Sequence, residues 1–166
     1  EHNGYFLDPS NPEVQTFLLQ LACEIIYTYH PDGINMDYIR YPQSNAPHSV
    51  GTDQLAWGYT NYARNDFKSI YGVDPITITP CDNYWQAWCD YRRDKVTYFV
   101  RRLSKICRSN KVNLTAVIFP NRCAALENKH QDWVVWSKND YIDGFTPLFL
   151  TCDPVTASDL MRGVIK

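Results

Sequence analysis

The 166-residue sequence lacks the features that mark several large classes of protein. No stretch approaches the 18 consecutive apolar residues typical of a transmembrane helix, so we predict no membrane-spanning segment. The formal net charge is −2, and no block of basic residues is present. Because binding to nucleic acid or to an anionic membrane relies on such blocks, we expect neither partner.

The cysteines also lack the spacing of a metal site. No Cys-x-x-Cys pair and no Cys/His cluster at zinc-ligand spacing occurs, so we predict no metal and no cofactor. Several of the cysteines fall on predicted apolar helix faces, where a free thiol behaves as a small hydrophobic group. We therefore expect no disulfide framework. The six cysteines are Cys23, Cys81, Cys89, Cys107, Cys123 and Cys152.

What the sequence does have is the composition of a packed domain. Hydrophobic residues make up 45% of the chain and charged residues 20%. Aromatic residues reach 14%, with five Trp and twelve Tyr. Such an excess can form platforms for sugar rings, but it more often fills cores and helix seams. The length predicts a single domain over residues 1–166.

Capping signals at Ser10 to Glu13 predict the first helix. His30 to Gly33 ends this helix and turns the chain into a short strand, and His30 is interpreted as a helix cap rather than a ligand. The helix is predicted to bury one stripe of residues at helical spacing. That stripe consists of Val14, Phe17, Leu18, Leu21, Ile25 and Tyr29.

The alternation of helices and strands continues to the end of the chain. The predicted elements are helices at 55–71, 85–108, 132–137 and from Asp153, and strands at 112–119 and 144–149. This order calls for parallel strands joined by right-handed crossovers. The sequence therefore predicts the α/β class, as a partial (β/α)8 TIM barrel with about three parallel strands and outer helices.

Polar side chains gather where the first predicted strand ends. Because a strand alternates its faces, Asn35 and Asp37 share the face opposite Ile34 and Met36. Asp37 is followed by Tyr38, Arg40 and Tyr41, a carboxylate beside a cation and two phenols, which suits a substrate with many hydroxyl groups. The alternative is that Asp37 and Arg40 form an ion pair that only stabilises the loop.

A second group of polar residues follows the strand at 112–119. Asn121 and Arg122 come directly after this strand and Pro120. The carboxyl ends of parallel strands meet at one edge of a sheet. We therefore expect Asn121 and Arg122 to lie on the same rim as Asp37 and Arg40.

Four stretches of the chain resemble the glycosyl hydrolase-like ten family, a bacterial family of (β/α)8 barrels related to retaining glycosidases. The stretches are Phe6 to Val14, Asp32 to Pro42, Trp88 to Val96 and Asp143 to Leu148. The resemblance implies a carbohydrate-active barrel of a periplasmic, cell-surface or secreted protein, such as an envelope lipoprotein. A full barrel needs about 250 residues, so this chain is expected to supply its middle portion.

The resemblance implies hydrolysis of glycosidic bonds in a poly- or oligosaccharide, with Asp37 as nucleophile or acid/base and Arg40 orienting it. Substrate-binding roles are expected for Asn35, Tyr38, Tyr41, Tyr84, Trp85, Asn121 and Arg122. Hydrolysis ordinarily needs two carboxyl groups, and only Asp37 is convincing. Asp82 and Glu127 are the other candidates, although Asp82 can instead cap the helix that follows.

The alternative function is a noncatalytic carbohydrate-binding or scaffold barrel, which keeps an aromatic rim without an acid pair. In either case a chain with about three strands leaves sheet edges open. We therefore expect the chain alone to be inactive as a glycosidase and to form a homodimer through the open barrel edges.

Overall fold

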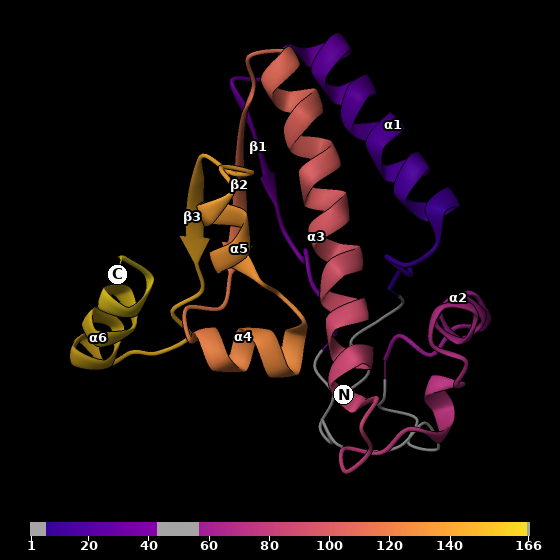
Figure 1. Ribbon diagram of the computed structural model, residues 1–166. Coiled ribbons are helices and arrows are strands. Elements are labelled where there is room, and N and C mark those ends of the chain that lie inside the picture. Colours follow the sequence, from indigo (N-terminus) through magenta and orange to yellow (C-terminus); the bar gives the residue numbers. More distant parts are fainter. Residues whose placement is uncertain (1–5, 43–56, 166) are drawn as a thin grey trace.

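The computed structural model describes residues 6–42 and 57–165 (Figure 1). Helices and strands alternate as the sequence predicts, and the fold belongs to the α/β class. The elements are α1 (Pro12–Tyr29), β1 (Gly33–Met36), α2 (Asn61–Tyr71), a 3-10 turn η1 (Pro75–Thr77), α3 (Trp85–Ser109), β2 (Asn113–Ile118), α4 (Arg122–Lys129), α5 (Trp133–Lys138), β3 (Gly144–Pro147) and α6 (Pro154–Ile165).

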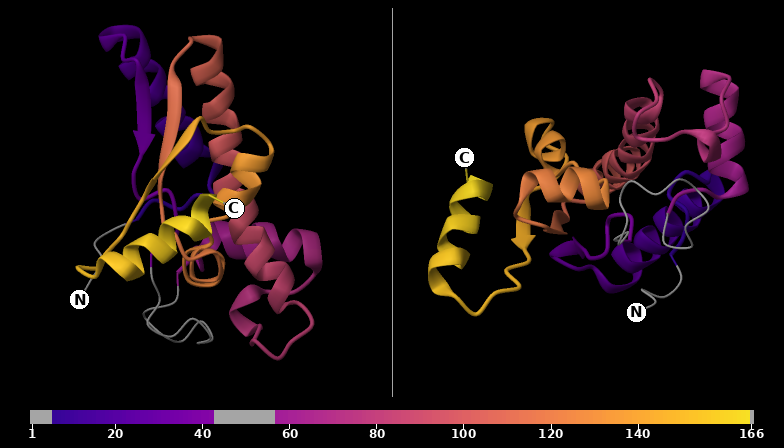
Figure 2. Two further views of the ribbon diagram at one scale, coloured as in Figure 1. Left: turned by 90° about the vertical axis from the view of Figure 1, so that its left-hand side faces the viewer. Right: turned by 90° about the horizontal axis from the view of Figure 1, so that it is seen from below.

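The sheet of the described residues is open and has three parallel strands in the order β1-β2-β3. Asn35 pairs with Thr115 in the β1-β2 register, and Thr115 pairs with Gly144 in the β2-β3 register. Figures 1 and 2 show helices joining the successive strands. The arrangement confirms the predicted partial barrel, because neighbouring parallel strands follow one another along the chain.

Side chains on one face of the sheet build the main core. Met36, Leu114, Ala116 and Ile118 alternate along β1 and β2 and are all buried. They pack with buried residues of α1, α3 and α5, and α1 and α3 lie side by side (Figure 1). On the opposite face the intervening positions, Asn35 among them, are exposed or partly exposed. The described helices therefore bury one face and leave the other to polar groups.

The buried face of α1 differs from the predicted stripe. Its buried residues are Gln15, Leu19, Ala22 and Ile26. Most of the predicted stripe is exposed in the described structure: Phe17 by 58%, Leu21 by 44%, Ile25 by 37% and Tyr29 by 73%. The prediction was wrong because α1 is apolar around much of its circumference, so helical spacing alone did not single out one face. Packing against α3 and the sheet selected the other side.

Helix α4 was missed by the sequence analysis, which passed from Asn121-Arg122 directly to the helix near Asp132. The helix has eight residues and carries no long apolar stripe, so periodicity gave no signal for it. Its N-cap was visible in the sequence, since the side chain of Asn121 accepts a hydrogen bond from the Ala124 amide. The segment at 73–80 is irregular apart from the short turn η1.

His30 caps α1 in a left-handed conformation, as the sequence predicts. Trp88, Val96 and Val100 of α3 are buried. Cys89 and Cys107 are buried free thiols, and no disulfide occurs among the described residues. None of the helices in the described ranges is both long and apolar enough to span a membrane.

A pair of substitutions tests the orientation of α1. Leu19→Ala should lower the free energy of unfolding by about 2–4 kcal/mol, because Leu19 is only 5% exposed and its removal leaves a cavity. Phe17→Ala should cost less than about 1 kcal/mol, because this side chain is largely exposed. Chemical denaturation of both variants of the 166-residue chain measures the difference. Equal losses would contradict the observed orientation.

Candidate functional site at the carboxyl end of the sheet

The carboxylate of Asp37 lies just beyond the end of β1. Asp37 and Asn35 are both exposed, and strand alternation places them on the face that the helices leave uncovered. Asp37 Oδ1 accepts a hydrogen bond of 2.7 Å from the Tyr38 amide. Tyr38 has a left-handed backbone, with φ 53°, and its carbonyl accepts a bond of 2.8 Å from the Arg40 amide. A tight turn therefore orients the carboxylate.

Hydroxyl and amide groups extend across the open face from Asn35. Its Oδ1 atom accepts hydrogen bonds from Thr115 Oγ1 at 2.9 Å and from Thr146 Oγ1 at 3.4 Å. These three residues come from β1, β2 and β3. The open face thus presents a connected polar row that leads toward Asp37.

Arg40 is half-buried between two aromatic rings. Its guanidinium carbon lies 4.7 Å from the ring centre of Tyr38 and 5.2 Å from that of Phe119. Burial lowers the pKa of Arg40, while Tyr38 and the charge of Asp37 act in the opposite direction. No ion pair joins Asp37 and Arg40 among the described residues, so Asp37 acts on Arg40 through its field rather than by direct contact.

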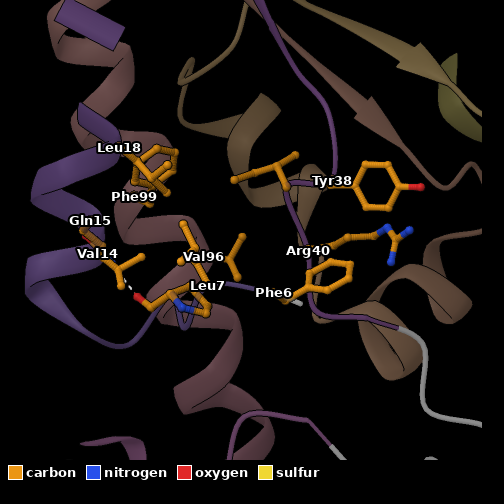
Figure 3. A pocket seen from close by; sticks show the side chains of 11 residues that line it. Phe6, Leu7, Val14, Gln15, Leu18, Tyr38, Arg40, Val96 and Phe99 are labelled. Carbon is orange, nitrogen blue, oxygen red and sulfur yellow. Dashed lines mark hydrogen bonds between the residues drawn. The ribbon is translucent and has the colours of Figure 1, made fainter. Parts of the chain in front are cut away.

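Figure 3 shows Tyr38 and Arg40 extending side by side from the loop after β1. Phe6 lies next to them, with its ring centre 5.9 Å from that of Tyr38. Behind these residues is a pocket of about 480 Å³, whose other walls are mostly apolar side chains of α1 and α3. Tyr38, Ile39 and Arg40 of the loop after β1 therefore form one side of this pocket.

Lys129 brings a second cation to the Phe119 ring. Its Nζ atom lies 4.7 Å from the ring centre, and the residue is only 5% exposed. Burial and the neighbouring charge of Arg40 lower the pKa of Lys129 to about 8. Two cations from different segments, the loop after β1 and the end of α4, thus meet at one aromatic ring.

Gln131 joins the segments that carry these cations. Its Nε2 atom donates to the carbonyls of Ile39 at 3.3 Å and Val117 at 3.0 Å. Its Oε1 atom accepts a bond of 3.0 Å from the Phe119 amide. The side chain is 1% exposed. Because a buried amide needs such partners, Gln131 fixes the loop after β1 against the end of β2.

Tyr41 is buried, with 4% of its surface exposed. Its ring contacts the edge of His130 at a centroid distance of 5.4 Å, and its amide donates to the Lys129 carbonyl at 2.9 Å. Burial raises the pKa of the Tyr41 phenol and lowers that of His130. Tyr41 therefore packs in the interior against the end of α4, whereas Tyr38 is 60% exposed.

The remaining sequence-predicted residues lie in two places. Asn121 and Arg122 are exposed at the start of α4, close to the end of β2, where Asn121 also serves as the N-cap. Tyr84 and Trp85 lie at the start of α3, where Tyr84 contacts the Tyr71 ring. No contact joins Tyr84 or Trp85 to Asp37 or Arg40 in the described ranges. The functional roles of all these residues stay predictions.

The two alternative carboxylates have different surroundings. Asp82 Oδ2 accepts bonds of 2.6 Å from both the amide and the hydroxyl of Thr79, which lower the pKa of Asp82. It closes the turn before α3 rather than capping the helix, whose N-cap is Tyr84. Glu127 is exposed on α4. Within the described structure, neither carboxylate contacts the loop after β1, and no cluster suited to a metal ion occurs.

Sequence reasoning missed Lys129, Gln131 and Asp8. Asp8 accepts bonds from Ser10 Oγ at 2.7 Å and from the hydroxyl of Thr60, so it ties the segment before α1 to the residues before α2. The Asp-Pro-Ser sequence at this position was a usable signal for such a turn. Lys129 and Gln131 gave no comparable signal, because their partners are distant in sequence.

Comparison with known proteins identifies one family. The model of the family described as glycosyl hydrolase-like 10 matches residues 2–153. No curated protein and no solved structure matches the chain.

Replacing Gln131 tests its structural role. Gln131→Leu should lower the free energy of unfolding by roughly 2–4 kcal/mol, because two carbonyls and one amide would lose their partner in the interior. The matched control is Gln20→Leu on the exposed side of α1, for which we expect less than about 0.5 kcal/mol. Urea denaturation measures both, and an equally small effect at Gln131 would contradict the role.

Proposed function

Because the chain belongs to the glycosyl hydrolase-like 10 family, we propose that this glycoside-hydrolase-like domain acts on the glycosidic bonds of a poly- or oligosaccharide. In this proposal Asp37 is a catalytic carboxylate, acting as nucleophile or as acid/base. Arg40 assists it electrostatically, because a nearby cation favours the charged form of a carboxylate.

One observation carries the proposal. Asp37 is an exposed carboxylate at the carboxyl end of β1, on the face that the helices leave uncovered. Barrel enzymes assemble their active sites at this end of their strands. The turn at Tyr38 holds the carboxylate by one oxygen, and the polar row from Asn35 offers hydrogen-bonding groups to sugar hydroxyls. Tyr38 supplies an exposed ring on which a sugar can stack.

A complete glycosidase site needs a second carboxyl group. The separation is about 5 to 5.5 Å for retention and about 6.5 to 9.5 Å for inversion. Neither Asp82 nor Glu127 contacts the loop after β1 in the described ranges, so we propose that a complete barrel supplies the second carboxyl group. This same observation favours the second candidate function, a noncatalytic carbohydrate-binding or scaffold barrel.

Replacing Asp37 separates the two candidate functions. In the full-length parent that we expect, Asp37→Asn should lower kcat by about a thousandfold or more, because the amide can act neither as nucleophile nor as acid/base. Release of reducing ends from a panel of polysaccharides measures turnover. The matched control is Asp32→Asn at the opposite end of β1, which should retain activity. Undiminished turnover by Asp37→Asn would remove Asp37 from the mechanism, and binding without turnover by the unaltered protein would establish the noncatalytic function.

Association of the 166-residue chain belongs to the same proposal. The outer edges of β1 and β3 carry no neighbouring strand among the described residues, and unpaired edges favour association. We expect this chain alone to form at least a dimer and to lack glycosidase activity, as light scattering and the same assay can test. A monomer with turnover would contradict both expectations. A periplasmic, cell-surface or secreted location is also proposed, on the family resemblance.

A further inference from the structure

We propose that a pocket of about 390 Å³ between α2, α3 and Tyr141 binds a neutral saccharide, away from the candidate site. This inference goes beyond the proposed function, because it depends neither on Asp37 nor on turnover. No residue of the loop after β1 lines this pocket. Tyr141 precedes the amino end of β3, whereas Asp37 follows the carboxyl end of β1, so the two lie at opposite ends of the parallel sheet.

Tyrosine rings from two helices provide apolar surface in the pocket. Tyr71, the last residue of α2, stacks on the buried Phe67 ring at a centroid distance of 4.4 Å, and 38% of Tyr71 is exposed. Tyr98 comes from α3 and is 45% exposed. Because the stacking on Phe67 holds the Tyr71 ring in place, its exposed surface can pack against the C–H groups of a sugar ring.

The carboxylate of Asp94 lines the same pocket and is available to a ligand. It makes no hydrogen bond and no ion pair with any residue that the structure describes. The cations beside it in the sequence bind other carboxylates, since Arg93 pairs with Asp90, and Lys95 pairs with Asp66 at 2.7 Å. Burial raises the pKa of Asp94, and the charge of Asp90 acts in the same direction. The Asp94 oxygens can therefore accept hydrogen bonds from a bound molecule.

Arg101 adds hydrogen-bond donors to the pocket. Its guanidinium carbon lies 5.1 Å from the ring centre of Tyr98, and no carboxylate lies within ion-pair distance of it in the described ranges. A hydroxyl group both donates and accepts, so the hydroxyls of one sugar can bond to Asp94 and to Arg101. A ligand with a net charge would meet a like charge at one of these two groups. The combination with the tyrosine rings therefore favours a neutral saccharide.

Titration of the 166-residue chain with oligosaccharides tests the pocket. The neutral probes are hexasaccharides of glucose, xylose, mannose, galactose and N-acetylglucosamine, and the charged probes are oligomers of galacturonate and of glucosamine. NMR shifts of the backbone amides report binding. We expect saturable shifts between Tyr91 and Arg101 with at least one neutral probe. A response limited to a charged probe would overturn the neutral class of ligand, and no saturable response in this segment would overturn the site.

Tyrosine variants test the aromatic surface. Tyr71→Ala and Tyr98→Ala should each weaken binding of the responding hexasaccharide by about tenfold or more, while Tyr98→Phe should keep most of it because the ring remains. The matched control is Tyr62→Ala, which removes a 41% exposed tyrosine of α2 outside the pocket and should leave the affinity unchanged. Unchanged affinity in both pocket Ala variants would overturn the inference, and Tyr98→Ala serves if Tyr71→Ala does not fold.

Polar variants test the two charged groups. Asp94→Ala and Arg101→Ala should each weaken binding by about fivefold or more, because a hydrogen bond to a charged group is lost. The matched control is Glu24→Ala, which removes an exposed carboxylate of α1. Affinity that survives both pocket substitutions would overturn the roles of Asp94 and Arg101.

The Asp37→Asn variant distinguishes failure of this inference from failure of the proposed function. It should bind the hexasaccharide at the pocket as tightly as the unaltered chain, even though it lacks turnover in the parent. Shifts confined to the loop after β1 would overturn the pocket and leave the proposed function intact. Turnover that survives the Asp37 substitution would instead overturn the proposed catalytic role and leave the pocket intact.

Discussion

The buried amide of Gln131 is the interaction on which the candidate site depends. It contacts the loop after β1 and the end of β2 at three backbone groups. Through these contacts the Arg40 side chain and the Phe119 ring come to lie together, although they are far apart in sequence. Because the Gln131 side chain is 1% exposed and has three hydrogen-bond partners, its removal would lower the free energy of unfolding. Its three bonds hold the loop after β1 against the end of β2, and they therefore also position the candidate site.

The described helices cover one face of the sheet and leave the polar side chains of the other face exposed or partly exposed. Met36 and Leu114 point into the core with α1 and α3, while Asn35 and Thr115 lie opposite and hydrogen-bond to one another. Because side chains of a strand alternate between its faces, neighbouring residues of β1 are buried and exposed in turn. Asp37 continues the polar side of the strand, so its side chain is exposed without cost to the core.

Much of the site was visible in the sequence because it lies in one short stretch. Alternation within Asp32 to Pro42 was enough to place Asn35 and Asp37 on the exposed face and Met36 in the core, and the structure confirms this. Burial of Tyr41 and the meeting of Lys129 with Arg40 were not predictable in this way. Each depends on α4, a short helix without a periodic signal, and on where its end packs.

The alternation of helices and strands and the parallel sheet were predictable from the sequence, because local periodicity and turn residues act over a few neighbours. The buried side of α1 was not, because packing against α3 and the sheet selected it. Phe17 and Leu19 are both apolar, yet one is 58% and the other 5% exposed. The same holds for the pair of cations at Phe119: contacts between distant segments arise from packing, and no spacing within the chain encodes them.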